Sequence, residues 1–269
     1  MKLAFIGDIV GSPGREMLKE HLKKIKTEYS IDVVVANYEN ASHGFGLTSQ
    51  NAKELFGYGV DIMSGGNHTF DKKDILPLLE DSRVLRPHNY PDEVAGSGCR
   101  VYDVAGEKLA VINLLGHYAM PVLENCFKAA LKCVDELHSK GVKNIFVDFH
   151  AEATSEKRAM MMLLQGKVSG IIGTHTHVGT DDFYIYDGSA YLSDIGLSGC
   201  RDNVIGMDKD SPLQYFLSGV KSHFDIPKKC KKILQIAILD IEDGRCKDAI
   251  KLKVLDDRRV FKTEAWHES

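Results

Sequence analysis

Apolar runs and amphipathic segments alternate through the first two thirds of the chain. The runs "KLAFIGD", "DVVVANYEN" and "VDIMSGGNH" are rich in apolar and β-branched residues, and they predict buried strands. Between the first two, "GREMLKEHLKKIKTEY" places Leu18, Leu22 and Ile25 on one stripe with lysines opposite, which predicts an amphipathic helix. "LTSQNAKELFGYG" predicts a second, shorter helix. Strands that alternate with helices in this way indicate β-α-β units.

Three later runs, "KLAVINLLG", "KNIFVDFHAE" and "VSGIIGTHTH", continue this pattern, with helices predicted at residues 122–139 and 154–167. The second of these helices begins with "TSEK", so a Thr or Ser side chain would cap it. The last third differs, because "FYIYDGSAYLSD" and "KILQIAILDIEDGRCKDAIKLKVL" each place a DG turn between two strands, as in a β-hairpin. We therefore predict an α/β fold, an αββα sandwich of two packed mixed β-sheets flanked by helices, in a single domain of residues 1–269.

The composition fits a globular chain and gives no sign of a membrane or nucleic-acid partner. The 269 residues are 43% hydrophobic and 27% charged, and their formal net charge is −4. That charge gives no general electrostatic attraction to nucleic acid or to a membrane surface. The sequence contains no run of about 18 apolar residues, the length of a membrane span. In "MKLAFIGDIVGSPGRE", Asp8 interrupts the apolar start where a signal peptide would continue, so we expect a first strand and a cytoplasmic protein.

The cysteines are scattered along the chain without a CxxC pair. They are Cys99, Cys126, Cys133, Cys200, Cys230 and Cys246. This spacing gives little support for a cysteine metal site, and we expect reduced, structural thiols. The basic run "KKCKK" around residue 230 is typical of a solvated patch beside a strand.

Five of the predicted strands end on side chains that can bind a metal or transfer a proton. They are Asp8 after the first strand, Glu39 and Asn40 after the second, Asn67 and His68 after the third, His150 after "IFVDF", and His175 and His177 after "SGII". Each alone has an ordinary explanation, such as a helix cap, a left-handed turn or a satisfied core histidine. In open α/β sheets, however, ligands gather at the carboxyl ends of the strands. Five coincidences of this kind therefore favour one shared site.

The donor types in this set indicate a metal site. Carboxylate, amide oxygen and imidazole together suit divalent metals such as Mn, Fe or Zn, and an acidic residue can bridge two ions. Two ions about 3.5–4 Å apart can hold both the attacking and the leaving oxygen of a phosphoryl transfer. The candidate ligands are sufficient for two ions with positions left for water and substrate: Asp8, Glu39, Asn40, Asn67, His150, His175 and His177.

In order and type, these residues resemble the calcineurin-like metallophosphoesterases, whose usual motifs are GDxHG, GDxxD, GNH[DE], H and GHxH. The segments "GDIVGSPGR", "ANYENASHGFG", "GGNHTFD", "DFHAEATSEK" and "GTHTHVGT" resemble more closely the YmdB-type bacterial branch, and together they span residues 7–180. The resemblance implies a metallophosphoesterase-like domain. For this branch it also implies phosphodiesterase activity on cyclic nucleotides, including 2′,3′-cyclic AMP.

The chain departs from the general family pattern at three places. Val10 stands where that pattern has a histidine, Glu39 where it has an aspartate, and Thr69 where an acidic residue usually follows the histidine. The YmdB-type pattern accounts for the first two departures. In that pattern Asn40 would supply the ligand that the missing histidine gives elsewhere, and Glu39 would bridge the two metals.

The resemblance also implies a role for each residue. The first metal would be held by Asp8, Glu39, Asn40 and His177, and the second by Glu39, Asn67, His150 and His175. A water or hydroxide between the ions would attack phosphorus. His68 would be the general acid for the leaving ribose oxygen, or would stabilise the developing charge, and Asp71 is the candidate to orient it. The ions would be two divalent or mixed-valence metals, Fe or Mn, with Zn as an option.

Two other classes of function are compatible with the same residues. One is a non-catalytic nucleotide-binding regulator, and the other is a phosphomonoesterase or nuclease on the same site. We expect a small nucleotide as binding partner, a homo-oligomer, no membrane partner, and no stable nucleic-acid partner because no basic stripe lies near the motifs. The loop at 193–207 would contact either phosphate or another subunit, and Gly173 and Gly179 would let the backbone turn around the "THTH" pair.

Overall fold

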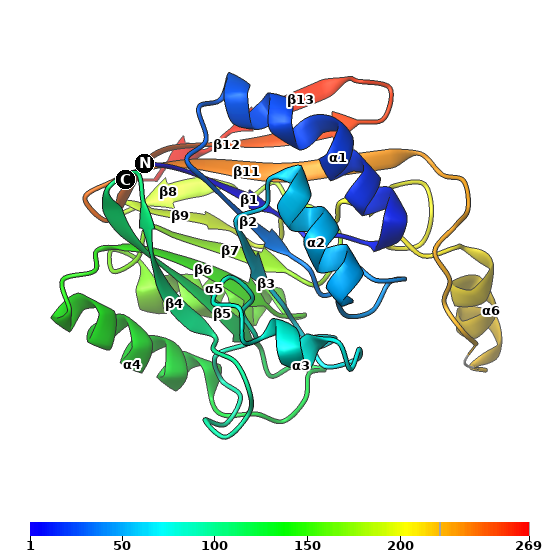
Figure 1. Ribbon diagram of the computed structural model, residues 1–269, viewed down its shortest axis with the longest axis horizontal. Coiled ribbons are helices and arrows are strands. Elements are labelled where there is room, and N and C mark those ends of the chain that lie inside the picture. The colour runs from blue at the N-terminus through cyan, green and yellow to red at the C-terminus, as the bar shows by residue number, and fades with distance from the viewer. Residues whose placement is uncertain (221, 269) are drawn as a thin grey trace.

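The computed structural model describes residues 1–220 and 222–268, and it has two mixed β-sheets that pack against each other between helices (Figure 1). This is the αββα sandwich that the alternation of apolar and amphipathic segments predicts. Each sheet has seven strands. Both sheets contain parallel and antiparallel strand pairs.

The first sheet combines the N-terminal strands with the C-terminal hairpin. Its order is β13 (Val260–Glu264), β12 (Arg245–Leu255), β11 (Lys232–Glu242), β1 (Lys2–Ile6), β2 (Val33–Asn37) and β3 (Ile62–Ser64), and β10 (Gly199–Cys200) also pairs with β11. Strands β1, β2 and β3 are parallel, whereas β11 runs antiparallel to β1. The predicted hairpin is confirmed: Asp243 and Gly244 both have positive φ angles between β11 and β12, as a tight hairpin turn requires.

The second sheet has a parallel centre. Its order is β14 (Trp266–His267), β8 (Tyr184–Tyr186), β9 (Ser189–Leu192), β7 (Gly170–Thr174), β6 (Asn144–His150), β5 (Glu107–Leu115) and β4 (Cys99–Val104). Strands β5, β6, β7 and β9 are parallel, and β8 and β9 form the second predicted hairpin. The hydrophobic pattern did not predict β4, whose side chains are mostly exposed or only partly buried.

The helices cover the two outer faces of the sandwich (Figure 1). Those on the first sheet are α1 (Gly11–Glu28) and α2 (Ser49–Tyr58), those on the second are α4 (Cys126–Ser139) and α5 (Thr154–Leu164), and α3 (Ile75–Leu78) is a single turn. Helix α4 begins later than predicted, because the Asn125 side chain caps it. The predicted cap of α5 is wrong: Thr154 is already helical, and Ala153 takes the cap position.

Three clusters of buried apolar side chains hold the layers together: one between the two sheets and one between each sheet and its helices. Along β1, Leu3 and Phe5 face the cluster between the sheets, whereas Ala4 and Ile6 face the cluster under α1 and α2. The Phe5 ring lies 4.9 Å from the ring of Phe146 on the opposite sheet. A central strand that is buried on both faces appears in sequence as a continuous apolar run, which explains why "KLAFI" shows no alternation.

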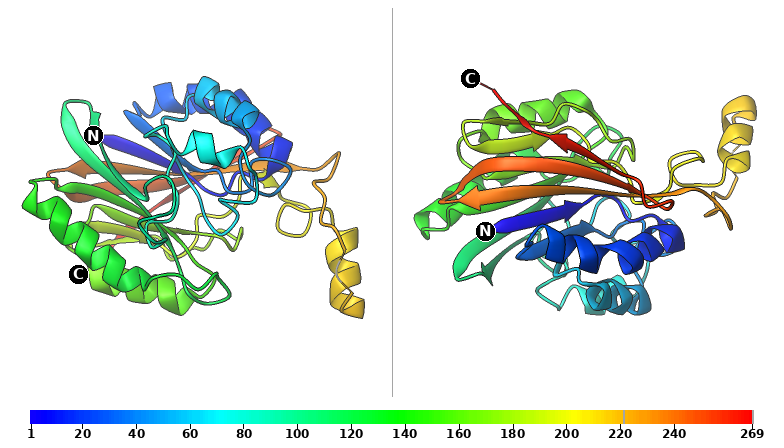
Figure 2. Two further views of the ribbon diagram at one scale, coloured as in Figure 1. Left: turned by 60° about the horizontal axis from the view of Figure 1, so that its bottom comes forward. Right: turned by 90° about the horizontal axis from the view of Figure 1, so that it is seen from above.

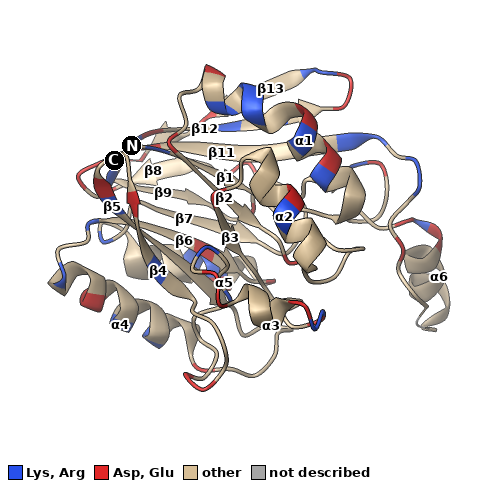
Figure 3. Ribbon diagram, in the orientation of Figure 1, with Lys and Arg blue, Asp and Glu red and all other residues tan. Residues whose placement is uncertain are grey.

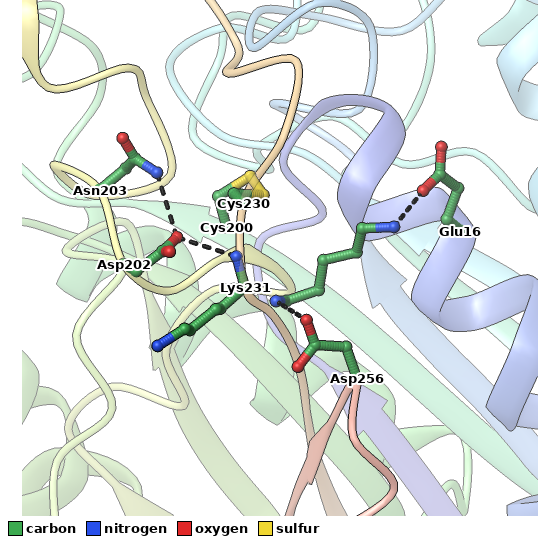
Figure 4. The surroundings of a disulfide bond; sticks show 8 residues. Glu16, Cys200, Asp202, Asn203, Cys230, Lys231 and Asp256 are labelled. Atoms are coloured by element: carbon green, nitrogen blue, oxygen red, sulfur yellow. Dashed lines mark hydrogen bonds and ion pairs between the residues drawn. A yellow bond between two sulfur atoms is a disulfide. The ribbon is translucent and has the colours of Figure 1, made fainter.

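One expectation about the cysteines is wrong. Cys200 and Cys230 form a disulfide, at the two ends of a segment that carries α6 (Asp210–Ser218) away from the body of the protein (Figures 2 and 4). Cys99, Cys126, Cys133 and Cys246 are free thiols, as expected. The "KKCKK" run does lie beside a strand, but its cysteine is part of this crosslink.

The charged residues on α1 and the character of the helices agree with what the composition indicates. Helix α1 carries basic residues (Lys and Arg) and acidic residues (Glu) along its length (Figure 3). Among the described residues, no helix has both the length and the apolar character needed to cross a membrane.

Candidate metal centre

The parallel strands bring the predicted ligands to one place. In the first sheet Ile6 pairs with Ala36 and Asn37 pairs with Ser64, so the loops after β1, β2 and β3 leave the same edge. In the second sheet His150 pairs with Thr174 at the ends of β6 and β7. The two edges meet, because side chains from both sheets are in contact there. Convergence at the carboxyl ends of parallel strands is the expected place for a site in an α/β fold.

One group of donors surrounds His150. Its Nε2 atom lies 3.2 Å from Glu39 Oε1, 3.0 Å from Asn67 Oδ1 and 3.0 Å from His175 Nδ1. Ligand atoms of Glu39, His150 and His175 all lie within 4.8 Å of one another. This grouping contains all four residues assigned to the second metal.

A second group shares Glu39 with the first. Ligand atoms of Asp8, Glu39 and His177 lie within 4.8 Å of one another, and His177 Nε2 lies 3.2 Å from Asn40 Oδ1. Asp8 Oδ1 is buried and has no hydrogen-bond partner among the described residues. A buried carboxylate oxygen without a partner is costly unless a cation satisfies it. The donor set would therefore fit divalent cations, and Glu39 belongs to both groups.

Burial and charge together set the ionisation of these groups. Burial by itself would raise the pKa of Glu39, but the charge of His150 beside it lowers that pKa to about 2. Burial would lower the pKa of His150, and the Glu39 carboxylate raises it to about 9. At Asp8 burial dominates and raises the pKa, with His177 opposing. The site therefore holds an ionised carboxylate in a dry place, where a cation would be stabilised.

The three histidines each turn one ring nitrogen toward the site and the other toward an oxygen. His177 Nδ1 faces the carbonyl oxygen of Ile205 at 2.8 Å, and His175 Nε2 faces Glu152 Oε2 at 3.0 Å. Histidines that ligate metals usually donate their second N–H in this way, which fixes the ring and the tautomer. The loop at 193–207 thus contributes Ile205 to the support of a ligand.

The turn at the "THTH" pair has a different origin from the one predicted. His175 and His177 themselves adopt positive φ angles of 99° and 64°, whereas Gly173 and Gly179 do not. Gly173 is needed for another reason, because a Cβ there would overlap the carbonyl oxygen of Ser193 on the neighbouring chain segment. Two left-handed non-glycine residues in one short loop are strained, and such strain concentrates at functional sites.

A glycine also shapes the centre itself. A Cβ on Gly66 would overlap both Glu39 Oε2 and His150 Nε2, so only glycine leaves the space between these donors open. The "GGNH" motif therefore contributes backbone space as well as the Asn67 side chain.

A buried ion pair that the sequence does not predict lies under the "THTH" loop. Lys157 and Asp194 are both about 1% exposed, and Lys157 Nζ lies 2.7 Å from Asp194 Oδ2 and donates to the Thr174 carbonyl. Asp194 also accepts a hydrogen bond from the backbone N–H of Thr176. Lys157 lies in an ordinary amphipathic helix pattern that predicts a solvent-facing lysine, so the sequence carries no local signal for this pair.

His68 lies at the border of the centre, separate from the ligand groups. Its Nδ1 atom is 2.8 Å from Asp71 Oδ2, and its ring packs edge-on against Phe45 with the ring centres 4.9 Å apart. Its backbone N–H donates to Glu39 Oε2. The side chain is 28% exposed, whereas Asp8, Glu39 and His150 are 0–1% exposed and His175 is 21% exposed. The structure thus places Asp71 where it can orient His68.

The chain is similar to known proteins over almost its whole length. A family model described as YmdB-like protein matches residues 4–252, which include every candidate ligand. The 2′,3′-cyclic-nucleotide 2′-phosphodiesterase of Bacillus subtilis (strain 168) is 40% identical over 268 residues, covering 97% of this chain and 99% of that protein.

Two solved structures are also similar to this chain. One is a hypothetical protein from Thermus thermophilus, with a TM-score of 0.88 at 34% identity, covering 98% of this chain and 100% of that chain. The other is a novel phosphatase from Mycoplasma pneumoniae, with a TM-score of 0.89 at 32% identity, covering 95% of this chain and 93% of that chain.

Proposed function

This chain belongs to the YmdB-like protein family, and from that membership we propose that it is a metal-dependent phosphodiesterase that hydrolyses small 2′,3′-cyclic nucleotides. The substrate class is taken from the Bacillus subtilis relative, which is similar along the full length of both proteins. The observation that carries the proposal is the pair of mostly buried donor groups that share Glu39. Cyclic nucleotides of the 3′,5′ type are the second substrate class that we propose.

The ligand roles follow from the two donor groups. Asp8, Asn40 and His177 would hold one ion, Asn67, His150 and His175 the other, and Glu39 both. Bound divalent or mixed-valence ions, Fe or Mn in preference to Zn, would neutralise charge on the phosphoryl group and make water more acidic. Because most of these ligands are buried and hydrogen-bonded, they would need little rearrangement to bind the ions.

His68 has the position of a general acid. Asp71 lies against Nδ1 and would accept the Nδ1–H of a protonated His68, which leaves the Nε2–H of that ring as the proton that can be given to substrate. Water would add to phosphorus, the bond from phosphorus to the ribose O2′ would break, and O2′ would take a proton from His68 while the proton of the water goes to solvent. The product would be a nucleoside 3′-phosphate. A ribose alkoxide is a poor leaving group, so its protonation would contribute to the rate enhancement.

A substrate panel tests this function against the two alternatives. Purified protein loaded with Mn²⁺ is assayed with 2′,3′-cyclic AMP, 3′,5′-cyclic AMP, bis-p-nitrophenyl phosphate, p-nitrophenyl phosphate and a short oligonucleotide. We expect 2′,3′-cyclic AMP to be converted to 3′-AMP, and chelation with EDTA followed by renewed Mn²⁺ to abolish and restore turnover. Binding of cyclic AMP without hydrolysis would instead support a regulator. Faster turnover of p-nitrophenyl phosphate or the oligonucleotide would support a phosphomonoesterase or a nuclease.

A further inference from the structure

His150 differs from the other two ligand histidines in the oxygen that supports it. His175 and His177 face a carboxylate and a backbone carbonyl, whereas His150 Nδ1 faces the hydroxyl of Thr174 at 2.9 Å. Carbonyl and carboxylate oxygens only accept hydrogen bonds, but a hydroxyl can donate or accept. The direction of the Thr174 hydroxyl therefore decides which nitrogen of a neutral His150 carries the proton.

Asp148 sets that direction. Thr174 Oγ1 donates to Asp148 Oδ1 at 2.7 Å, and Asp148 Oδ2 accepts from Asn37 Nδ2 at 2.9 Å and from the Ser64 hydroxyl. Three donors around one carboxylate leave it as an acceptor, so the only hydroxyl hydrogen of Thr174 points to Asp148. The Thr174 oxygen is then free to accept the Nδ1–H of His150.

The arrangement is built into two neighbouring strands. Asp148 and His150 are two residues apart on β6, which places their side chains on the same face, and His150 pairs with Thr174 on β7. All three side chains are fully buried. In such a place each polar hydrogen must have a protein partner, so the direction of one bond constrains the next.

We propose that Asp148 and Thr174 are positioning residues that keep the proton of a neutral His150 on Nδ1, so that Nε2 can present a lone pair between Glu39, Asn67 and His175. The proposal deepens the proposed function and rests on it, because Nε2 is the atom assigned to a metal. Neither residue would contact substrate, and their effect would be on the affinity for the ion.

Binding of Mn²⁺ alone to the metal-free full chain provides the first test. Thr174→Val keeps the shape but removes the hydroxyl, Asp148→Asn places an amide donor in the network, and Thr174→Ser keeps the hydroxyl. We expect the first two variants to bind Mn²⁺ about 10–100-fold more weakly by calorimetric titration, and Thr174→Ser to bind within about threefold of the parent protein. Ser169→Ala is the matched control. Ser169 lies next to the start of β7, and its buried hydroxyl donates to the Gly244 carbonyl. Its removal should leave the affinity for Mn²⁺ unchanged.

A spectroscopic readout does not depend on any variant folding. In protein with ¹⁵N-labelled histidine and bound Zn²⁺, we expect the His150 proton on Nδ1, with slow exchange against solvent because of its bond to Thr174. A proton on Nε2 would overturn the proposal. The proposal would also be overturned if Thr174→Val bound Mn²⁺ as tightly as the parent protein, or if Thr174→Ser bound Mn²⁺ as weakly as Thr174→Val. A parent protein that binds no Mn²⁺ would overturn both proposals, whereas Mn²⁺ binding without hydrolysis of any cyclic nucleotide would overturn the proposed function alone.

Discussion

The ligand cluster and the His68 border lie side by side but are built differently. Asp8, Glu39 and His150 are 0–1% exposed and His175 is 21% exposed, whereas His68 and Asp71 are 28% and 45% exposed. Each ligand histidine has a fixed oxygen partner, and a buried ion pair supports the loop that carries two of them. The difference follows from the proposed chemistry. Ions need donors at fixed distances in a dry place, whereas a group that delivers a proton must reach substrate and exchange with solvent.

Among the predicted metal ligands, we expect Glu39→Ala to have the largest effect on metal content and turnover. Loss of the shared carboxylate should remove both ions and lower turnover by at least about 10³-fold, because bound metal supplies several kcal/mol of transition-state stabilisation. Metal content by mass spectrometry and turnover of 2′,3′-cyclic AMP check this together. Glu28→Ala removes an exposed carboxylate on α1 and is the control. A Glu39→Ala protein that still hydrolyses substrate would end the claim that Glu39 bridges the ions.

His68→Ala, at the border of the metal centre, should impair catalysis without impairing metal binding. We expect turnover to fall by about 10³-fold, within the range of general acid catalysis, while metal content stays the same because His68 is not a ligand. The same two measurements check this variant. If metal is lost together with activity, His68 is itself needed for metal binding, and the distinction drawn between His68 and the ligands is wrong.

Lys157→Met tests whether the buried ion pair supports the cluster. Removal of one partner leaves the Asp194 carboxylate buried without its cation, which should lower the free energy of unfolding by about 3 kcal/mol. Urea denaturation measures the change, and Lys128→Met, at an exposed position on α4, should change stability by less than about 0.5 kcal/mol. Equal stability of Lys157→Met and the parent protein would show that the pair does not hold the loop.

Asp71→Ala should have the smallest effect, because Asp71 acts only through His68 and its side chain is half exposed. We expect kcat to fall by about tenfold, the equivalent of about 1.4 kcal/mol, with KM and metal content unchanged. Steady-state kinetics with 2′,3′-cyclic AMP check this. A fall as large as that of His68→Ala would show that Asp71 takes part in proton transfer itself.

The fold could be predicted largely because its strands are buried on one or both faces and its hairpins have DG turns. Apolar runs such as "KLAFI" and "VVVAN" match β1 and β2, and both hairpins lie where Asp187–Gly188 and Asp243–Gly244 predict them. The exceptions are exposed elements. Strand β4 is mostly open to solvent, and α6 has few buried residues, so neither shows the apolar periodicity on which the prediction depends.

The ligands could be predicted because polar residues at strand ends stand out in sequence, but their supports could not. Asp148 lies within the apolar run of β6, and Lys157 lies in an amphipathic helix 37 residues from its partner Asp194. The disulfide joins cysteines 30 residues apart, without a short-range motif. In each case the partner is brought near only by the packing of the sheets and loops, which local patterns do not contain.

The most direct test of the two-ion centre is anomalous diffraction from crystals soaked in Mn²⁺. We expect two peaks about 3.5–4 Å apart, one among Glu39, His150 and His175 and the other among Asp8, Glu39 and His177. A single peak, or peaks away from Glu39, would show that the chain does not hold two ions around this carboxylate.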